Sequence, residues 1–556
     1  MNGRTTSRRL ELIILALSAS ACQFLFADSS PQGCLDNLDC VLGQVCDTAS
    51  GTCIPSNSFK PLSVVDAQVT PPKSSSTATT QFAAIDLKTV DSQNLELVLQ
   101  RAVLLEGTIA SPDAPGGVPG MLAAVRRPLF DNRTLSFNIT VSESGFFSQQ
   151  VAPGKYRLLF KPSRREAFPQ LVLEPATVGG GEVPLPRYLP FADPQTDDLQ
   201  DQDPLLVVRG QILASQTQPH PVAGLQVEAV TAAGLRSSLA QPDEQGFFYL
   251  RLPLAWQVTE DGDLEATTPA SANIVISPAG AEVRLPTVEI TDVALDTPDL
   301  GVFYLGEVPP VHALSGVVLD AHGRPVADCQ LKLRVEPVAA GSFTMLINND
   351  STGHFATTLP AGQLTVTVIP PAVGEVALAS FDLLLDADRQ VQLTLPPRPL
   401  LSGQVTDDAG LPVADVIVRA ERISTTAGED DGIYSSFEAG SGSDGIFAMS
   451  VDPGRYRVVF LPPAASGLPR SLPKVAYVQQ DTVMEAAACR LSPPTLVSGR
   501  ILDGAGQPVC GASVQFFYSP DDSTSHLVGE SISGGIIEEC SGNFSLLLPA
   551  DVPVER

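Results

Sequence analysis

The residues best suited to covalent chemistry are nine cysteines, four of which share one short stretch. These four are separated by five, five and six intervening residues, at Cys34, Cys40, Cys46 and Cys53. Two zinc-binding pairs would need a shorter CxxC-type spacing within each pair. We therefore predict two disulfides, with a metal site as the alternative, in a segment too short for an apolar core. The spacing leaves the pairing open.

A second distinctive stretch is acidic and runs from residue 193 to residue 204. It places five carboxylates in one linker, at Asp193, Asp197, Asp198, Asp201 and Asp203. Such oxygen-rich linkers can bind Ca²⁺, which would stiffen the connection. The alternative is a solvated loop, because the spacing does not match the twelve-residue calcium loop with its Gly and terminal Glu. Calcium is the only cofactor that the sequence suggests.

Side chains for catalysis are sparse. The five histidines stand mostly beside Gly, Pro or Ser in predicted turns: His220, His312, His322, His354 and His526. No two of them have a metal-ligand spacing, and neither an HExxH motif nor a GxSxG nucleophile elbow is present. We predict that the protein is not an enzyme.

The first residues have the pattern of an export signal. Positive charges precede a short apolar core, at Arg4, Arg8, Arg9 and residues 12–17. The small residues that follow, ending at Cys22, resemble a bacterial lipobox. This resemblance implies a lipoprotein signal peptide over 1–21 and a diacylglyceryl anchor on Cys22. The alternatives are a secretory peptide cleaved near Ala27 and, less well matched because of Glu11, a twin-arginine signal.

No later stretch approaches the roughly 18 apolar residues of a membrane span, so we expect contact with a membrane through acyl chains alone. Residues 22–55 look like the small Cys-rich knobs that follow the lipid anchor in predatory and fruiting soil bacteria. Residues 56–100 are predicted to be a Pro/Ser/Thr tether followed by a closing strand. Gln23 lacks the Asp that retains enteric lipoproteins at the inner membrane, which favours the outer membrane.

Composition narrows the class of protein. The chain of 556 residues has 34 Lys and Arg against 62 Asp and Glu, a net charge of −28. This charge disfavours binding to nucleic acid or to anionic lipid. Pro (48) and Gly (44) are abundant while apolar residues still make up 44%. The combination is typical of turn-rich β structure with real cores.

Paired glycines recur along most of the chain. The first members open predicted strands at Gly107, Gly210, Gly316, Gly403 and Gly499. The second members follow after 38, 36, 37, 42 and 43 residues, at Gly145, Gly246, Gly353, Gly445 and Gly542. A repeat of this kind indicates a series of similar small domains.

Each repeat has strand and turn signals but no long helical period. A Gly-x-Pro turn separates two strands, and the second glycine precedes an aromatic residue predicted to lie in the core: Phe146, Phe247, Phe355, Phe447 or Phe544. A PGxYxxxF strand follows in the first and fourth repeats, with apolar residues at every second position. In the second repeat we expect Trp256 to take the place of the Tyr.

These motifs, SGxVxDxxGxPVxxxxV, DGxF and PGxYxxxF, resemble the carboxypeptidase regulatory-like domain. The resemblance implies an all-β fold of tandem seven-stranded, transthyretin-like antiparallel sandwiches arranged as beads on a string. It is complete in the fourth repeat and weakest in the first two. The expected sandwiches span 101–200, 201–308, 309–398, 399–495 and 496–556.

The fifth repeat stops where its PGxYxxxF strand should begin. We interpret it as C-terminally incomplete, either because the chain is a fragment or because another chain donates the strand. Residues 82–99 resemble residues 378–395, which close the third repeat. We therefore expect 82–99 to supply a closing strand to an incomplete N-terminal unit.

The remaining cysteines lie within the repeats. Cys510 and Cys540 occupy neighbouring turns of the fifth repeat, which makes a disulfide between them plausible. Cys329 and Cys489 have no evident partner and are predicted to be buried thiols.

Together these features favour a non-enzymatic, lipid-anchored envelope protein with a structural, adhesive or partner-binding role. Its expected partners are the membrane, through acyl chains, and envelope proteins or polysaccharide, but not nucleic acid. A carbohydrate-binding surface protein is one alternative, although aromatic residues are only 6%. An accessory chain to a separately encoded peptidase is another.

Overall fold

The computed structural model describes residues 44–47, 52–55, 62–109, 116–126, 136–178, 207–258, 264–267, 269–280, 285–306, 309–336, 341–424, 432–519, 525–534 and 540–550. Within these ranges the regular structure is β-strand, apart from one short 3-10 turn at Ala464–Ser466. No helix there is long and apolar enough to cross a membrane. The prediction of an all-β protein built from tandem domains is confirmed.

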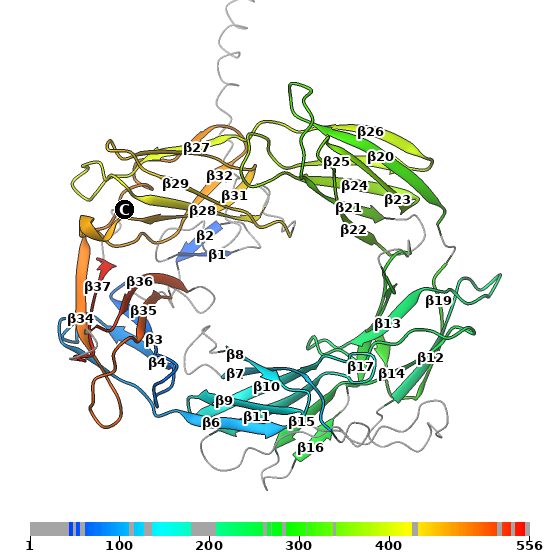
Figure 1. The fold of residues 1–556 in the computed structure, drawn as a ribbon, viewed down its shortest axis with the longest axis horizontal. Helices are drawn as coiled ribbons and strands as arrows, with labels where there is room; N and C mark the ends of the chain where they lie inside the picture. The colour runs from blue at the N-terminus through cyan, green and yellow to red at the C-terminus, as the bar shows by residue number, and fades with distance from the viewer. Residues whose placement is uncertain are drawn as a thin grey trace, which may run out of the picture.

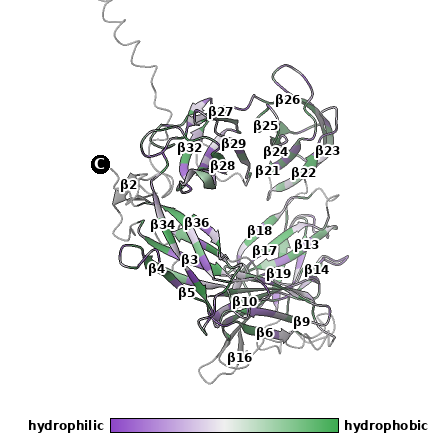
Figure 2. Ribbon diagram, turned by 60° about the vertical axis from the view of Figure 1, so that its left-hand side comes forward, coloured by the Kyte–Doolittle hydropathy of each residue, from purple (hydrophilic) through white to green (hydrophobic). Residues whose placement is uncertain are grey.

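Five apolar cores divide the strands into five small sandwiches. Figure 1 shows the sandwiches following one another around a ring in chain order, with the last beside the first. Figure 2 shows hydrophobic and hydrophilic residues mixed along the same strands, as expected for sheets with one buried face. The sandwiches are therefore strung in chain order, as expected, and the string closes on itself.

The third sandwich has the basic topology, and the other sandwiches are variants of it. Its strands are β20 (Val311–Leu319), β21 (Gln330–Glu336), β22 (Phe343–Asn348), β23 (His354–Pro360), β24 (Gly362–Ile369), β25 (Ala379–Leu385) and β26 (Arg389–Thr394). A three-stranded sheet, β23-β20-β26, faces a four-stranded sheet, β22-β21-β24-β25. On β24, Leu364, Val366 and Val368 are buried while the intervening threonines are more exposed, as the alternation predicts.

The fourth sandwich repeats this topology. Its strands are β27 (Leu400–Gln404), β28 (Ile417–Ser424), β29 (Ser436–Gly440), β30 (Ile446–Ser450), β31 (Gly454–Leu461), β32 (Lys474–Val478) and β33 (Thr482–Val483). They form the sheets β30-β27-β33 and β29-β28-β31-β32. The motif residues Tyr456, Val458 and Phe460 point into the core from β31, as predicted.

The first two sandwiches are joined by a shared sheet. The strands of the first are β6 (Val103–Thr108), β7 (Gly120–Arg126), β8 (Ser136–Val141), β9 (Phe146–Val151), β10 (Gly154–Pro162) and β11 (Leu171–Val178). Those of the second are β12 (Val207–Leu213), β13 (Leu225–Val230), β14 (Phe247–Arg251), β17 (Ser271–Pro278), β18 (Val288–Ala294) and β19 (Asp299–Tyr304). A hairpin between β14 and β17 extends the larger sheet of the first sandwich, with strands β15 (Leu254–Val258) and β16 (Leu264–Thr267).

This hairpin corrects the assignment of Trp256. The residue lies on β15, which pairs in parallel with β11 of the neighbouring sandwich. The place expected for the Trp256 strand is taken by β17, which pairs antiparallel with β13. β17 has the same apolar alternation as the expected strand, so the pattern did not distinguish them. It buries Ala272, Ile274 and Ile276.

The fifth sandwich is completed from the other end of the chain. Its strands are β34 (Pro494–Leu502), β35 (Ser513–Tyr518), β36 (His526–Ile532) and β37 (Asn543–Pro549), together with β3 (Val64–Thr70), β4 (Thr80–Asp86) and β5 (Leu95–Val98). They form the sheets β36-β35-β3-β4 and β37-β34-β5. β3 is antiparallel to β35 and β5 is parallel to β34. β31 and β33 have the same relations to β28 and β27 in the fourth sandwich.

We call residues 62–99 the closing segment. Its first strand, β3, lies where we expect a Pro/Ser/Thr tether, so that part of the prediction for 56–100 is wrong. The expectation of an incomplete fifth sandwich is wrong, because this segment supplies the missing strands within the same chain. Residues 82–99 do supply a closing strand, as predicted. The strand closes the fifth sandwich, however, and not an N-terminal unit, so the predicted location is wrong. Six apolar side chains of the segment are buried in that core: Leu62, Val65, Ala67, Val69, Leu97 and Leu99.

Close packing explains the paired glycines. Each first glycine lies opposite a buried phenylalanine in the neighbouring strand, in the pairs Gly107–Phe147, Gly210–Phe248, Gly316–Phe355, Gly403–Phe447 and Gly499–Phe544. A Cβ atom on Gly210 would stand 2.6 Å from the Phe248 ring. Each second glycine has a positive φ, such as +81° at Gly353, where side chains are disfavoured. Both positions therefore require glycine.

The same register corrects two predicted core residues. Phe146 and Phe247 are 48% and 37% exposed, whereas Phe147 and Phe248 are buried. In all five sandwiches the buried aromatic lies two residues after the second glycine. Because successive side chains of a strand point to opposite faces, a shift of one residue exchanges inside and outside.

Candidate functional site

Several of the sequence-predicted site residues lie outside the described residues: Cys22, Cys34, Cys40, Asp193, Asp197, Asp198, Asp201 and Asp203. The backbone of two knob cysteines is described. Cys46 and Cys53 are register partners in a hairpin of β1 (Gln44–Asp47) and β2 (Thr52–Pro55). Among the residues that the structure describes, no three His, Cys, Asp or Glu side chains are grouped to hold a metal ion. The anchor, the knob disulfides and the calcium site stay predictions.

The other cysteines behave as expected. Cys510 and Cys540 form a disulfide with their Cα atoms 5.7 Å apart. Cys329 and Cys489 are free and fully buried. Burial raises the pKa of the Cys329 thiol to about 11, with a smaller contribution from the charge of Asp328. Burial also raises the pKa of Cys489. Both thiols are therefore structural in character.

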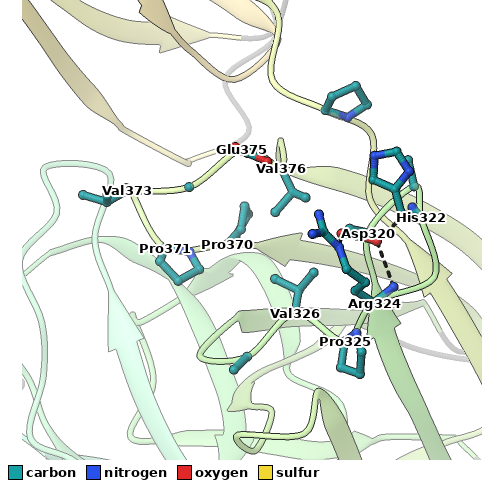
Figure 3. Close-up of a pocket in the computed structure, with 14 residues that line it drawn as sticks. Asp320, His322, Arg324, Pro325, Val326, Pro370, Pro371, Val373, Glu375 and Val376 are labelled. Atoms are coloured by element: carbon teal, nitrogen blue, oxygen red, sulfur yellow. Dashed lines mark hydrogen bonds and ion pairs between the residues drawn. The ribbon is translucent and has the colours of Figure 1, made fainter.

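A cavity in the described structure lies at one end of the third sandwich, beside its joint with the fourth. It has a volume of about 490 Å³. One wall is the turn between β20 and β21, residues 320–327, and the other is the loop 370–376 after β24. Figure 3 shows the two walls facing each other, with the Arg324 side chain between them. We treat this cavity, the joint pocket, as the candidate functional site.

Asp320 organises the first wall. Its Oδ1 accepts hydrogen bonds from the backbone N–H groups of His322 and Arg324, both at 2.8 Å. Its Oδ2 accepts one from Arg324 Nε at 2.7 Å. The Arg324 backbone N–H, helped by the guanidinium, lowers the pKa of Asp320. Asp407 and Asp503 make the equivalent turn contacts in the next two sandwiches, so this wall belongs to the repeat.

Arg398 holds the second wall. Its Nη1 donates to the carbonyl oxygens of Ala372 (2.8 Å) and Gly374 (2.9 Å), and its Nη2 donates to that of Pro371 (3.0 Å). The Arg398 backbone N–H also donates to the Glu375 carbonyl at 2.8 Å. The loop thus keeps its shape because one buried guanidinium satisfies its carbonyl groups.

The same arginine reaches the fourth sandwich. Arg398 Nε donates to Asp452 Oδ1 at 3.0 Å, and the two side chains are only 2% and 5% exposed. The guanidinium also lies 5.3 Å from the centre of the Phe437 ring, in cation–π geometry. Asp452 Oδ1 accepts a further bond from the Leu378 backbone N–H, and its carbonyl accepts one from Tyr456 Oη at 2.6 Å. The second wall of the joint pocket is therefore held in place by contacts that reach the fourth sandwich, although the lining residues belong to the third.

The lining of the joint pocket is suited to binding. Prolines and valines form its apolar walls, and Val373 at its rim is 94% exposed. Arg324 and His322 add hydrogen-bond donors, while Asp320 and Glu375 add carboxylates. Among the described lining residues there is no Ser, Thr, Cys or Lys. The groups present can hold an apolar side chain beside a polar one.

Sequence reasoning missed most of this site. It placed His322 in a turn but attached no role to Arg398 or Asp452. A signal was present, because Arg398 is an arginine within a proline-rich linker and Asp452 precedes the PGRY motif. Their pairing joins residues 54 positions apart, which no local sequence pattern records.

Comparisons with known proteins give no family. The sequence matches no protein-family model, and no curated protein matches it. Among solved structures, a streptococcal ancillary pilin is similar over 52% of this chain and 99% of its own, with 12% identity and a TM-score of 0.22. The Bacillus anthracis TIE protein (10% identity, 70% and 72%, TM-score 0.15) and the Streptococcus agalactiae minor pilin GBS52 (11%, 35% and 97%, 0.20) are also similar. Likenesses of this size carry no weight for function.

Proposed function

We propose that this chain is a non-enzymatic, lipid-anchored envelope protein whose ring of sandwiches is a structural or adhesive platform for partner proteins. The observation that supports this most is the closing segment, which ties the first sandwich to the last. A chain closed on itself holds its loops in fixed relative positions. Such preorganisation lowers the entropic cost of binding a partner.

The joints between sandwiches support the same proposal. Glu228 of the second sandwich accepts ion pairs from Arg165 of the first and Arg236 of its own. Thr287 and Ser342 exchange two backbone hydrogen bonds between the second and third, at 2.7 and 3.1 Å. The buried Arg398–Asp452 pair joins the third and fourth. Each of these joints has contacts beyond the covalent linker, which favours a platform over a flexible tether.

The joint pocket is the surface we assign to partner binding. Its proline walls and the exposed Val373 suit an apolar side chain of an extended peptide segment. Arg324, whose side chain is 69% exposed, suits a carboxylate or a backbone carbonyl beside it.

Site-specific photo-cross-linking in cells tests this assignment. A photoreactive residue replaces Val373, and the matched control replaces Val483 on β33, which is 76% exposed and is not among the lining residues. We expect a discrete protein adduct from position 373 and none from 483. Adducts from neither position, or equal adducts from both, would overturn partner binding at the joint pocket.

The anchor needs its own test, because it lies outside the described residues. We expect Cys22→Ala to abolish labelling by a palmitate analogue and to shift the protein out of the membrane fraction. Unchanged labelling and fractionation would remove the lipoprotein assignment. Saturable binding on a glycan array, or peptidase activity in a co-purified partner, would favour the carbohydrate-binding or the accessory role instead.

A further inference from the structure

We infer that the cavity between the fourth and fifth sandwiches, here the arginine cavity, is a binding site for a small oxyanion of the phosphate or sulfate type. It has a volume of about 200 Å³. The fourth sandwich contributes the outer faces of β28 and β31 and the residues before β32, and the fifth contributes the start of β36. The site therefore spans the joint next to the sandwich that closes the ring.

Three arginines line the arginine cavity, all from the fourth sandwich: Arg419, Arg457 and Arg470. His526 faces them from the fifth sandwich, and Glu421 is the only carboxylate among the described lining residues. This is a local concentration of positive charge on a chain whose net charge is −28. Guanidinium groups are the side chains best matched to oxyanions, because their planar N–H groups can bond two oxygens at once.

Three hydrogen-bond donors in the lining of the arginine cavity lack an acceptor in the described structure. Arg457 Nε, Arg470 Nε and Ser525 Oγ are buried and have no hydrogen-bond partner among the described residues. Buried donors without acceptors are rare because each costs free energy. An oxyanion in the cavity would accept from both Nε–H groups and from the Ser525 hydroxyl, which removes that cost.

The carboxylates nearby do not fully balance the arginines. Arg419 Nε donates to Glu438 Oε1 at 2.6 Å, but both side chains are about half exposed. Arg470 Nη1 lies 3.9 Å from Glu530 Oε1, at the limit of an ion pair. Among the described residues no carboxylate is within ion-pair distance of Arg457. Arg457 is thus the charge with the greatest need of an anion.

Burial also makes the charge of Arg470 unfavourable without an anion. Burial lowers the pKa of Arg470, and the neighbouring charge of Arg419 acts in the same direction, while Glu530 and Glu421 act against both. A bound anion would stabilise the charged guanidinium. The walls on both sides of the joint would then share one ligand, so binding should fasten the fourth sandwich to the fifth.

Titration of the full-length protein with inorganic phosphate tests the site. Binding is followed by ³¹P NMR and by calorimetry at constant ionic strength. We expect saturable binding that is competed by sulfate, and at least tenfold weaker binding in Arg457→Gln. The matched control is Arg334→Gln on β21, an exposed arginine paired with Glu336 at 2.8 Å outside this cavity, which should bind like the wild type.

Glycerol phosphate distinguishes the two sources of such a ligand. Its exclusion would support a free ion, and binding as strong as that of phosphate would support a phosphate ester. If circular dichroism shows that Arg457→Gln does not fold, Arg470→Gln takes its place. If the wild type shows no saturable binding, the cavity holds only water and the inference is overturned. Equal affinity in Arg457→Gln and Arg334→Gln also overturns it.

Discussion

Arg398 shows how one side chain can set the geometry of a joint. Its guanidinium binds three carbonyl groups of one loop, one carboxylate of the next sandwich and the face of Phe437. A buried ion pair often adds little net stability compared with an apolar pair, but it fixes one arrangement of the groups around it. We attribute the shape of the joint pocket to this specificity.

Removing Asp452 should be costly. Asp452→Ala leaves the Arg398 charge buried without its partner, a loss of about 3 to 5 kcal/mol. Hydrogen exchange measures this loss of stability locally. The Leu378 backbone N–H, which donates a hydrogen bond to Asp452, should exchange at least about 100-fold faster in the variant. The control is Glu438→Ala, which breaks the exposed pair with Arg419 and should cost under about 1 kcal/mol. Similar effects of the two substitutions would refute this account of the joint.

Cys329 should make the fold sensitive to alkaline pH. Its pKa is about 11 in the folded protein, above the ordinary value of 9.0. The fold therefore favours the protonated thiol, and this contribution to stability is complete below about pH 9 and is lost as the pH rises toward 11. We expect the urea midpoint of the wild type to fall more between about pH 8.5, which lies below this window, and about pH 10.5, which lies within it, than that of Cys329→Ala. Parallel pH profiles would contradict the expectation.

At the scale of elements, the closing segment shows what sequence patterns can and cannot predict. Alternating apolar residues and turn glycines were enough to predict strands, because each depends on neighbours close in the chain. The similarity of 82–99 to 378–395 also predicted a closing strand correctly. Its partner was not predictable from local pattern, because β34 lies some 400 residues away, as the Ser498–Gln93 separation of 405 shows.

The candidate site was less predictable than the fold. The turn of Asp320 and the burial of Cys329 follow from local pattern and composition. Arg398, Asp452, Arg457 and Ser525 acquire their roles only from contacts across sandwiches, and no periodicity records which faces of two domains will meet.

The closing segment should stay bound when its covalent link is cut. An engineered protease site between Leu99 and Val103 separates it from the first sandwich without changing a residue of β3, β4 or β5. Because the segment is held by strand pairing and by a shared core, we expect both fragments to elute together in size-exclusion chromatography. They should separate only in denaturant. Separation in native buffer would show that the pairing depends on the link.

At the scale of the whole molecule, Gly499 controls closure of the ring. A side chain there would collide with the Leu95 carbonyl oxygen of β5, and backbone cannot yield as a flexible side chain can. We expect Gly499→Val to displace β5 and to increase the maximum dimension measured by small-angle X-ray scattering. The control is Gly504→Ala in the same sandwich, where a Cβ meets nothing within 4 Å. Identical scattering from both variants would argue against closure in solution.

The pairing of strands from the two ends of the chain also delays completion of the fold during synthesis. The strands β3, β4 and β5 are synthesised first, yet β34 and β35 emerge about 400 residues later, which at 5–20 residues per second is about 20 to 80 s. During that interval an apolar strand edge is unpaired. The nascent polypeptide therefore requires a chaperone or rapid export to prevent strand pairing with another polypeptide.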